Sequence, residues 1–172
     1  IQTVYERVTP YVYKNAIDLS GLEVNSKKQA FIHMMLPSIL IAKDQLTQER
    51  KKVLALQAKK NHLSEEEQEY INILFKTYKC KEIDDLISKL QTHPTSIVLA
   101  QAAIESGWGT SRFYRDANNV FGVWSYNSSE PRIKASEERD GKAIYVKKYD
   151  ALPESILSYF KTIARGPYSK FR

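Results

Sequence analysis

The sequence predicts a mainly α-helical protein with one small β-hairpin inserted late in the chain, an α+β arrangement. Apolar residues recur at spacings of three and four through most of the first 106 residues, which is the periodicity of helices packed on one face. Period-two alternation occurs over residues 132–149, around a tight-turn signal. With 172 residues, 42% hydrophobic and 27% charged, the chain fits one compact domain, or one domain with a helical annex.

The N-terminal half is expected to be a helical segment. The first helix begins near Ser26, and Pro37, which has no backbone N–H, should kink or split it. Ser64 and Glu67 have the spacing of a capping box and open a second helix, and a shorter helix follows over about 83–90. The buried positions of the first helix are expected to include Phe31, Met34, Met35, Ile39, Ala42 and Leu46.

The C-terminal half alternates between helices and the hairpin. Pro94 suits the first turn of a helix over roughly 94–106, and this helix is apolar nearly all round, so it is expected to be buried. The hairpin is expected over 132–149 with Asp-Gly at 140–141 as its turn. A last helix is expected from about 153 to the Gly-Pro pair that follows residue 165.

Composition narrows the classes of partner. The net charge of +6 suits an anionic partner, but the lysines are spread along the chain, so a solvated surface is the simpler explanation. No basic stripe or known motif indicates nucleic acid. No apolar stretch reaches the ~18 residues that span a bilayer, so no transmembrane segment is expected. We expect a monomer.

No metal or cofactor is expected. His33, His62 and His93 have no ligand-like spacing with one another or with Cys80. No glycine-rich phosphate loop is present. Since Cys80 is the only cysteine, no intramolecular disulfide can form.

Glu105 stands at the end of the apolar helix predicted over 94–106. A carboxylate there faces the negative end of the helix dipole, and the apolar turn before it should partly desolvate it. Both effects favour the protonated carboxyl that a general acid needs to protonate a departing glycosidic oxygen. The alternative is an exposed glutamate in a surface ion pair.

Aromatic residues crowd the segment after Glu105, with six in the 19 positions 108–126 against 11% in the whole chain. Flat rings with polar edges suit pyranose sugars, although such clusters more often belong to a core. We expect Phe113 and Phe121 in the core and Trp124 and Tyr126 in a cleft.

The hairpin could close the other side of such a groove. It carries three carboxylates, any of which could act as the second catalytic group: Glu137, Glu138 and Asp140.

Three motifs and a tyrosine carry a resemblance to a known family. The motifs are AQAAIESGWGTS (100–111), NNVFG (118–122) and YDALPES (149–155), and Tyr168 follows them. Together they resemble the bacterial β-N-acetylglucosaminidase family, glycoside hydrolase family 73. The helical segment 27–90 is also similar to the Bax-like proteins of Gram-negative bacteria within that family.

The resemblance implies a lysozyme-like glucosaminidase domain over 91–172, with the helical segment 1–90 packed on it. It implies peptidoglycan glycan strands as substrate, cut at the N-acetylglucosaminyl β-1,4 bond. Glu105 falls on the family's catalytic acid, and Glu137 is the best match to its second carboxylate. The residues expected to bind substrate are Trp108, Phe121, Trp124, Tyr126, Tyr149 and Tyr168.

The reaction could be completed in three ways. Glu137 could activate water with inversion or attack directly with retention, or the acetamido group of the substrate could attack. A muramidase or lytic transglycosylase, or a non-catalytic wall-binding protein, are the alternative functions. The resemblance also implies export to the periplasm or cell envelope of a Gram-negative bacterium, with a leader that is not in this chain.

Overall fold

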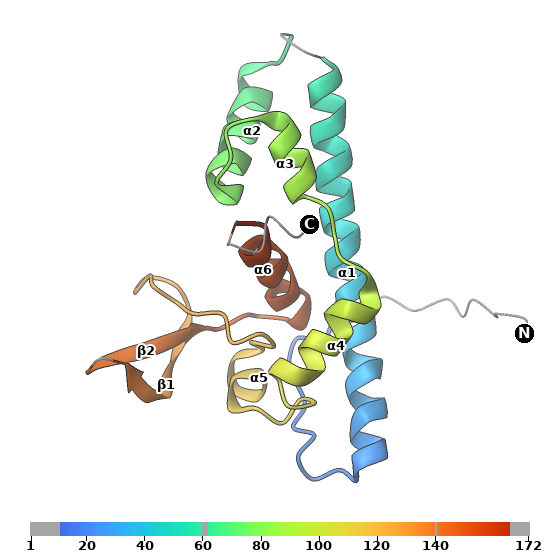
Figure 1. Cartoon of the computed structure of the whole chain (residues 1–172), viewed down its shortest axis with the longest axis vertical. Coiled ribbons are helices and arrows are strands. Elements are labelled where there is room, and N and C mark those ends of the chain that lie inside the picture. The colour runs from blue at the N-terminus through green and yellow to red at the C-terminus, as the bar shows by residue number, and fades with distance from the viewer. Residues whose placement is uncertain (1–10, 60–61, 140, 166–172) are drawn as a thin grey trace, which may run out of the picture. The chain divides into compact units, whose positions relative to one another are not determined.

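The structure, a computed structural model, describes residues 11–59, 62–139 and 141–165. Figure 1 shows helices and one hairpin in these ranges, which confirms the predicted mainly helical fold. In chain order the elements are α1 (Val24–Ala58), α2 (Glu65–Tyr78), α3 (Ile83–Lys89), α4 (Thr95–Glu105), α5 (Arg112–Ala117), β1 (Arg132–Arg139), β2 (Lys142–Lys147) and α6 (Leu152–Arg165).

The chain groups into two compact units. The first takes its described residues from Ile1–Ile41 and Thr95–Ile156, and the second from Ala42–Pro94 and Leu157–Arg172. Each unit therefore draws on both sides of residue 90, and the functional boundary expected there stays a prediction. Glu105, the aromatic segment and the hairpin all belong to the first unit.

Helix α1 continues through Pro37, so the split considered from the sequence does not occur. A proline lacks the donor for only one bond of the helical ladder. The next residue, Ser38, is buried and donates its hydroxyl to the carbonyl of Met34 at 2.9 Å. The predicted apolar positions of this helix are confirmed as buried: Phe31, Met34, Met35, Ile39, Ala42 and Leu46.

The second unit contains the predicted capping box at the start of α2. Ser64 Oγ accepts from the Glu67 backbone N–H at 3.2 Å, and the Glu67 carboxylate accepts from the Ser64 N–H at 3.0 Å. These two bonds satisfy donors that the first helical turn leaves without partners. The helix ends at Lys79, whose backbone is left-handed with a φ of 51°.

The hairpin is antiparallel and contains a bulge in β1. Lys134 pairs with Tyr145 and Glu138 with Ala143, so residues 135–137 of β1 lie opposite Ile144 alone. A bulge bends its strand and redirects the side chains that it carries. Gly141 has a φ of +70°, as a tight turn needs, while Asp140 lies outside the described residues.

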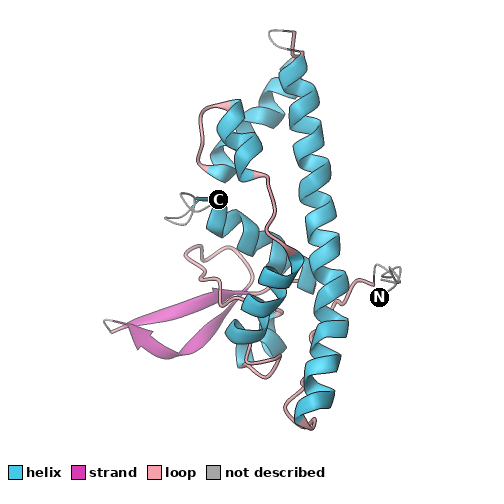
Figure 2. Cartoon of the chain, turned by 45° about the vertical axis from the view of Figure 1, so that its right-hand side comes forward, coloured by secondary structure: helices cyan, strands magenta, loops and turns pink. Residues whose placement is uncertain are grey.

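The other edge of β2 carries the segment that precedes the hairpin. Trp124 forms a β-bridge with Val146, the Ser125 N–H donates to the Tyr145 carbonyl at 2.8 Å, and the Lys147 N–H donates to the Val123 carbonyl at 2.9 Å. Figure 2 shows the two paired strands side by side. Hydrogen bonding thus fixes the aromatic segment 124–126 beside β2.

Candidate active site

Glu105 is the last residue of α4, as the sequence predicts, but it is exposed. The expectation that this helix is buried all round is wrong: Ile97 and Ile104 are 47% and 77% exposed. Its buried side chains are Val98, Ala102 and Ala103. An apolar sequence alone does not specify how many faces of a helix pack against other elements. Here Ile104 and Glu105, in the last turn, are exposed to solvent.

The Glu105 carboxylate is also unpaired. The described residues offer it no hydrogen bond and no ion pair, so the alternative surface ion pair is not found there. Because Glu105 is exposed, the burial that the sequence led us to expect is not found either. A carboxylate in this state is accessible to a ligand.

The turn after Glu105 is tightly bonded around the buried Ser106. Its hydroxyl donates to the Ala102 carbonyl at 2.6 Å and accepts from the Gly109 N–H at 3.1 Å. The backbone is left-handed at Gly107, Trp108 and Gly109, with φ of 57°, 58° and 78°. This conformation is rare for a bulky residue such as tryptophan, and it persists only where the surroundings enforce it. The turn therefore holds the end of α4 in one conformation.

Trp108 packs against helix α1. Its ring meets Phe31 edge-to-face with centroids 5.6 Å apart, and Lys28 Nζ lies 5.5 Å from the centroid of the indole ring. These contacts make Trp108 an anchor for the turn, and its predicted role in sugar binding stays a prediction. The same holds for Phe121 and Tyr149, which are both half-buried.

Trp124 and Tyr126 are brought together as the sequence suggested for a cleft. Their ring centroids lie 6.1 Å apart, and the residues are 39% and 85% exposed. They line a shallow hollow of about 280 Å³ whose other lining residues are Ser125, Lys142, Ala143, Ile144 and Tyr145. Exposed rings over a hollow offer the flat apolar faces that sugars require.

The candidate second carboxylates differ in their surroundings. Glu137 belongs to the bulge of β1, but its side chain lies outside the described residues, as do Asp140 and Tyr168. Glu138 pairs with Lys134 across the bulge, with Nζ and Oε1 3.3 Å apart.

Glu130 is a further carboxylate, which the sequence did not single out. It accepts hydrogen bonds from Lys147 Nζ at 2.8 Å and from Ser125 Oγ at 2.7 Å. The bond from Lys147 is the main reason why the pKa of Glu130 lies below its usual value. Glu130 is therefore an ionised group that closes the loop before the hairpin.

Asn119, which sequence reasoning missed, holds the base of the hairpin. It is buried, its Nδ2 donates to the carbonyls of Val123 and Lys147 at 3.0 and 2.9 Å, and its Oδ1 accepts from the Val123 N–H at 2.9 Å. Both N–H donors and one of the two acceptor sites of this amide are thus used on loop and strand backbone.

Asn118, the other asparagine of the NNVFG motif, joins three separate segments. It ends α5 in a left-handed conformation, its Nδ2 donates to the carbonyls of Lys14 and Tyr149 at 2.8 Å each, and its Oδ1 accepts from the Ala16 N–H at 2.8 Å. Its partners lie as far as 104 positions away in the sequence, so no local signal could have identified them.

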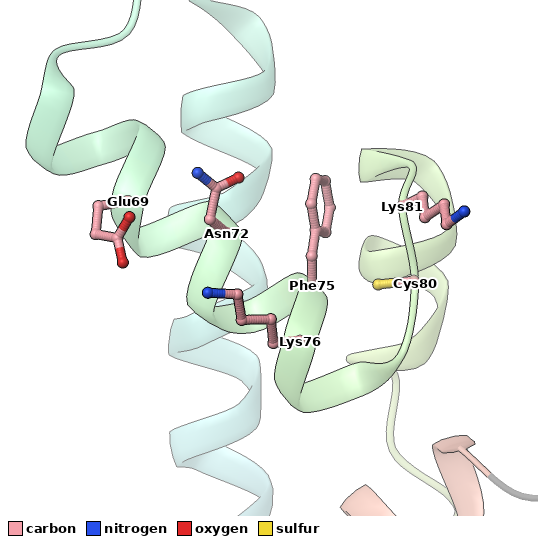
Figure 3. Close-up of a pocket in the computed structure, with 6 residues that line it drawn as sticks. All are labelled: Glu69, Asn72, Phe75, Lys76, Cys80 and Lys81. Atoms are coloured by element: carbon pink, nitrogen blue, oxygen red, sulfur yellow. The ribbon is translucent and has the colours of Figure 1, made fainter.

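The described ranges give little support for a metal site, a membrane-spanning helix or a cysteine nucleophile. No three His, Cys, Asp or Glu side chains gather there as a metal site, and no described helix is long and apolar enough to cross a membrane. Figure 3 shows a second hollow, between α2 and the segment that follows it, with Phe75 and Cys80 among its lining residues. Burial raises the pKa of the Cys80 thiol, which keeps it protonated and a poor nucleophile.

Comparison with known proteins identifies the family. The family model named Glucosaminidase, described as mannosyl-glycoprotein endo-beta-N-acetylglucosaminidase, matches residues 80–172, more than half of the chain. The chain belongs to the glucosaminidase family. The resemblance that the sequence motifs carried is therefore confirmed, and Glu105, the hollow and the hairpin all lie inside the matched region.

Several curated proteins are similar to this glucosaminidase-family chain. Protein bax of Escherichia coli is 28% identical over 155 residues, which cover 85% of the chain and 54% of that protein. Peptidoglycan hydrolase FlgJ of Salmonella typhimurium is 33% identical over 93 residues, 48% of the chain and 29% of that protein. Exo-glucosaminidase LytG of Bacillus subtilis is 34% identical over 76 residues, 41% of the chain and 27% of that protein.

The chain thus spans about half the length of the Escherichia coli relative and less of the other two. Among solved structures, the catalytic domain of the autolysin Auto from Listeria monocytogenes is 26% identical, with 70% of this chain and 67% of that chain covered and a TM-score of 0.36.

Proposed function

We propose that this chain is a peptidoglycan hydrolase that cleaves the N-acetylglucosaminyl β-1,4 bond, with Glu105 as the general acid. The observation that carries the proposal is the exposed, unpaired carboxylate at the end of α4, inside the region that matches the glucosaminidase family. The names of two relatives, a peptidoglycan hydrolase and an exo-glucosaminidase, support the substrate class. A net charge of +6 suits an anionic wall polymer.

In this mechanism Glu105 donates its proton to the glycosidic oxygen while positive charge develops on the sugar ring. A glycan lying over the end of α4 would displace water from the carboxyl group, which favours the protonated acid at the moment it is needed. Trp124 and Tyr126 would hold sugar rings against the hollow beside β2.

Two routes finish the reaction most simply. Glu137 could activate water, in which case the two carboxyl groups should lie about 6.5–9.5 Å apart, or the acetamido group of the substrate could attack and no protein nucleophile is needed. Direct attack by Glu137 would require a separation of about 5–5.5 Å. The stereochemistry of the first product, read by NMR, separates inversion from the two retaining routes.

The test of Glu105 is its replacement by glutamine, which keeps the size of the side chain and removes the proton. Because Glu105 is exposed, Glu105→Gln should unfold at the wild-type temperature yet lose about 10²-fold or more of its rate on purified peptidoglycan. Glu66→Gln, which changes an exposed glutamate in the second unit, is the matched control and should keep full activity. Near-normal activity of Glu105→Gln would remove Glu105 from the mechanism.

The new chain ends identify the bond that is cut. Mass spectrometry of the digest should find reducing-end N-acetylglucosamine. Reducing-end N-acetylmuramic acid would indicate a muramidase and anhydro-muramyl ends a lytic transglycosylase, while sedimentation with walls but no soluble product would indicate a binding protein. Oligosaccharide products would support the endo activity that we propose, and single sugars an exo activity. A wall substrate also supports a location in the cell envelope, and we propose the periplasm.

A further inference from the structure

Arg112, the first residue of α5, reaches across to the bulge of β1. Its Nη1 donates to Ser136 Oγ at 2.9 Å and its Nη2 donates to the Lys134 carbonyl at 2.6 Å. The two acceptors lie on either side of residue 135, within the part of β1 where pairing with β2 is irregular. The planar guanidinium thus holds the bulge through two bonds in a fixed geometry.

The same arginine is tied to the end of α4. The buried Ser106, next to Glu105, accepts at its carbonyl from the N–H of Thr110 at 3.1 Å and of Ser111 at 2.9 Å. Ser111 then caps α5, with its Oγ accepting from the Tyr114 N–H at 3.2 Å. Hydrogen bonds therefore connect Ser106, the residue after Glu105, to Ser111, which directly precedes Arg112 in the chain.

These two connections together join Glu105 to the bulge. Glu137 follows Ser136 directly in that bulge. We propose that Arg112 is a positioning residue, which fixes the bulge of β1, and Glu137 with it, relative to Glu105. The inference rests on the proposed glycosidase function, because a fixed spacing of these two groups matters only if both take part in bond cleavage.

A positioning role predicts a loss in turnover with little loss in binding. A displacement of about 1 Å at reacting groups can lower the rate about 10²-fold. A weakened bulge contact should act in this way, because neither Arg112 nor Ser136 is among the residues that line the aromatic hollow. The pair that Arg112 Nε makes with Asp116, at 3.5 Å, lies on the surface and contributes little by itself.

The experiment measures kcat and KM of the full chain on soluble, uncrosslinked glycan strands. Arg112→Gln should lower kcat about 10–100-fold and change KM less than about 3-fold. Arg112→Lys keeps the positive charge but replaces the two Nη donors with a single ammonium group, so it should recover only part of the loss. The matched control is Arg115→Gln on the same helix, which removes an exposed ion pair with Asp18 at 2.8 Å but no contact with the hairpin, and should keep the wild-type kcat.

Hydrogen exchange supplies a readout that does not depend on activity. Amides of residues 134–138 should exchange faster in Arg112→Gln than in the wild type and in Arg115→Gln. An unchanged kcat in Arg112→Gln, or an equal fall in both arginine variants, would overturn the positioning role while Glu105 kept its own. A wild-type chain that released no reducing ends from any glycan would instead refute the proposed function, and the inference with it.

Discussion

Gly109→Ala is expected to destabilise the first unit strongly, because one added methyl group meets two separate costs. Gly109 has a φ of +78°, and such a left-handed backbone destabilises a residue with a Cβ by about 1–2 kcal/mol. The methyl group would also lie 3.0 Å from Leu19 Cδ1, 3.1 Å from Tyr114 Cε1 and 3.2 Å from Phe31 Cδ2.

These three neighbours are themselves buried, so they cannot move out of the way into solvent. Overpacking of this kind costs about 1–3 kcal/mol. The two contributions together predict a loss of about 2–5 kcal/mol in the free energy of unfolding.

Gly122→Ala is the matched control. Gly122 has a φ of +60°, but an added Cβ would meet no atom within 4 Å, so only the backbone cost of about 1–2 kcal/mol applies. The effect of alanine on the unfolded chain is the same in both variants and cancels in their difference. That difference therefore isolates the crowding around residue 109.

Urea unfolding followed by tryptophan fluorescence is the assay. Trp108 and Trp124 are the two tryptophans of the chain and both belong to the first unit, so the signal reports that unit. Gly109→Ala should lose at least about 1 kcal/mol more than Gly122→Ala. Equal losses in the two variants would refute the reasoning, because they would mean that Phe31 and Tyr114 do not confine the turn.

Two other predictions concern the base of the hairpin. Asn119→Ala leaves the Val123 N–H and the Lys147 carbonyl without the side-chain partner, and each such half-buried group costs about 1–3 kcal/mol, so urea unfolding should show a loss of at least about 2 kcal/mol. For Glu130, a folded pKa below the usual 4.5 means that the group stabilises the protein above that pH and loses this contribution as the pH falls. The difference in melting temperature between the wild type and Glu130→Gln should therefore shrink from pH 7 to pH 3, and a constant difference would contradict the pairing with Lys147 and Ser125.

Features that depend on neighbouring residues could be predicted from the sequence. Ser64 and Glu67 are three positions apart, and the structure contains both bonds of the capping box. The helix that ends at Glu105 and the hairpin that begins at Arg132 were also found, because the apolar period and the Asp-Gly turn are local signals. Local periodicity gave the type of each element, but it did not determine what each element packs against.

Features that depend on distant partners could not be predicted. Helix α4 is apolar on nearly every face, yet Ile104 beside Glu105 is 77% exposed, because burial is decided by the rest of the fold. Arg112 finds its acceptors 22 and 24 positions further along the chain. An arginine at the start of a helix has no feature in the sequence that would separate such a clamp from a solvated side chain.

Buried polar groups join the second and third sequence motifs into one frame. Asn118, of the second motif, binds the carbonyl of Tyr149, the first residue of the third. The Val120 N–H donates to the buried hydroxyl of Ser155 at 3.0 Å, which makes a second link between the same motifs. Glu105, in the first motif, is exposed and has no partner among the described residues.

Substitutions of these buried polar residues and substitutions of the exposed Glu105 should have different effects. A change in the frame removes hydrogen bonds between segments, so stability and turnover should fall together, because a site on two elements is only as precise as the contacts that hold them. A change at Glu105 removes no such bond, so turnover should fall alone. Variants that lose activity but keep full stability should therefore cluster at exposed positions of the first motif and the hairpin. A variant of a buried asparagine with wild-type stability and no activity would contradict this, because it would show that the frame takes part in the chemistry itself.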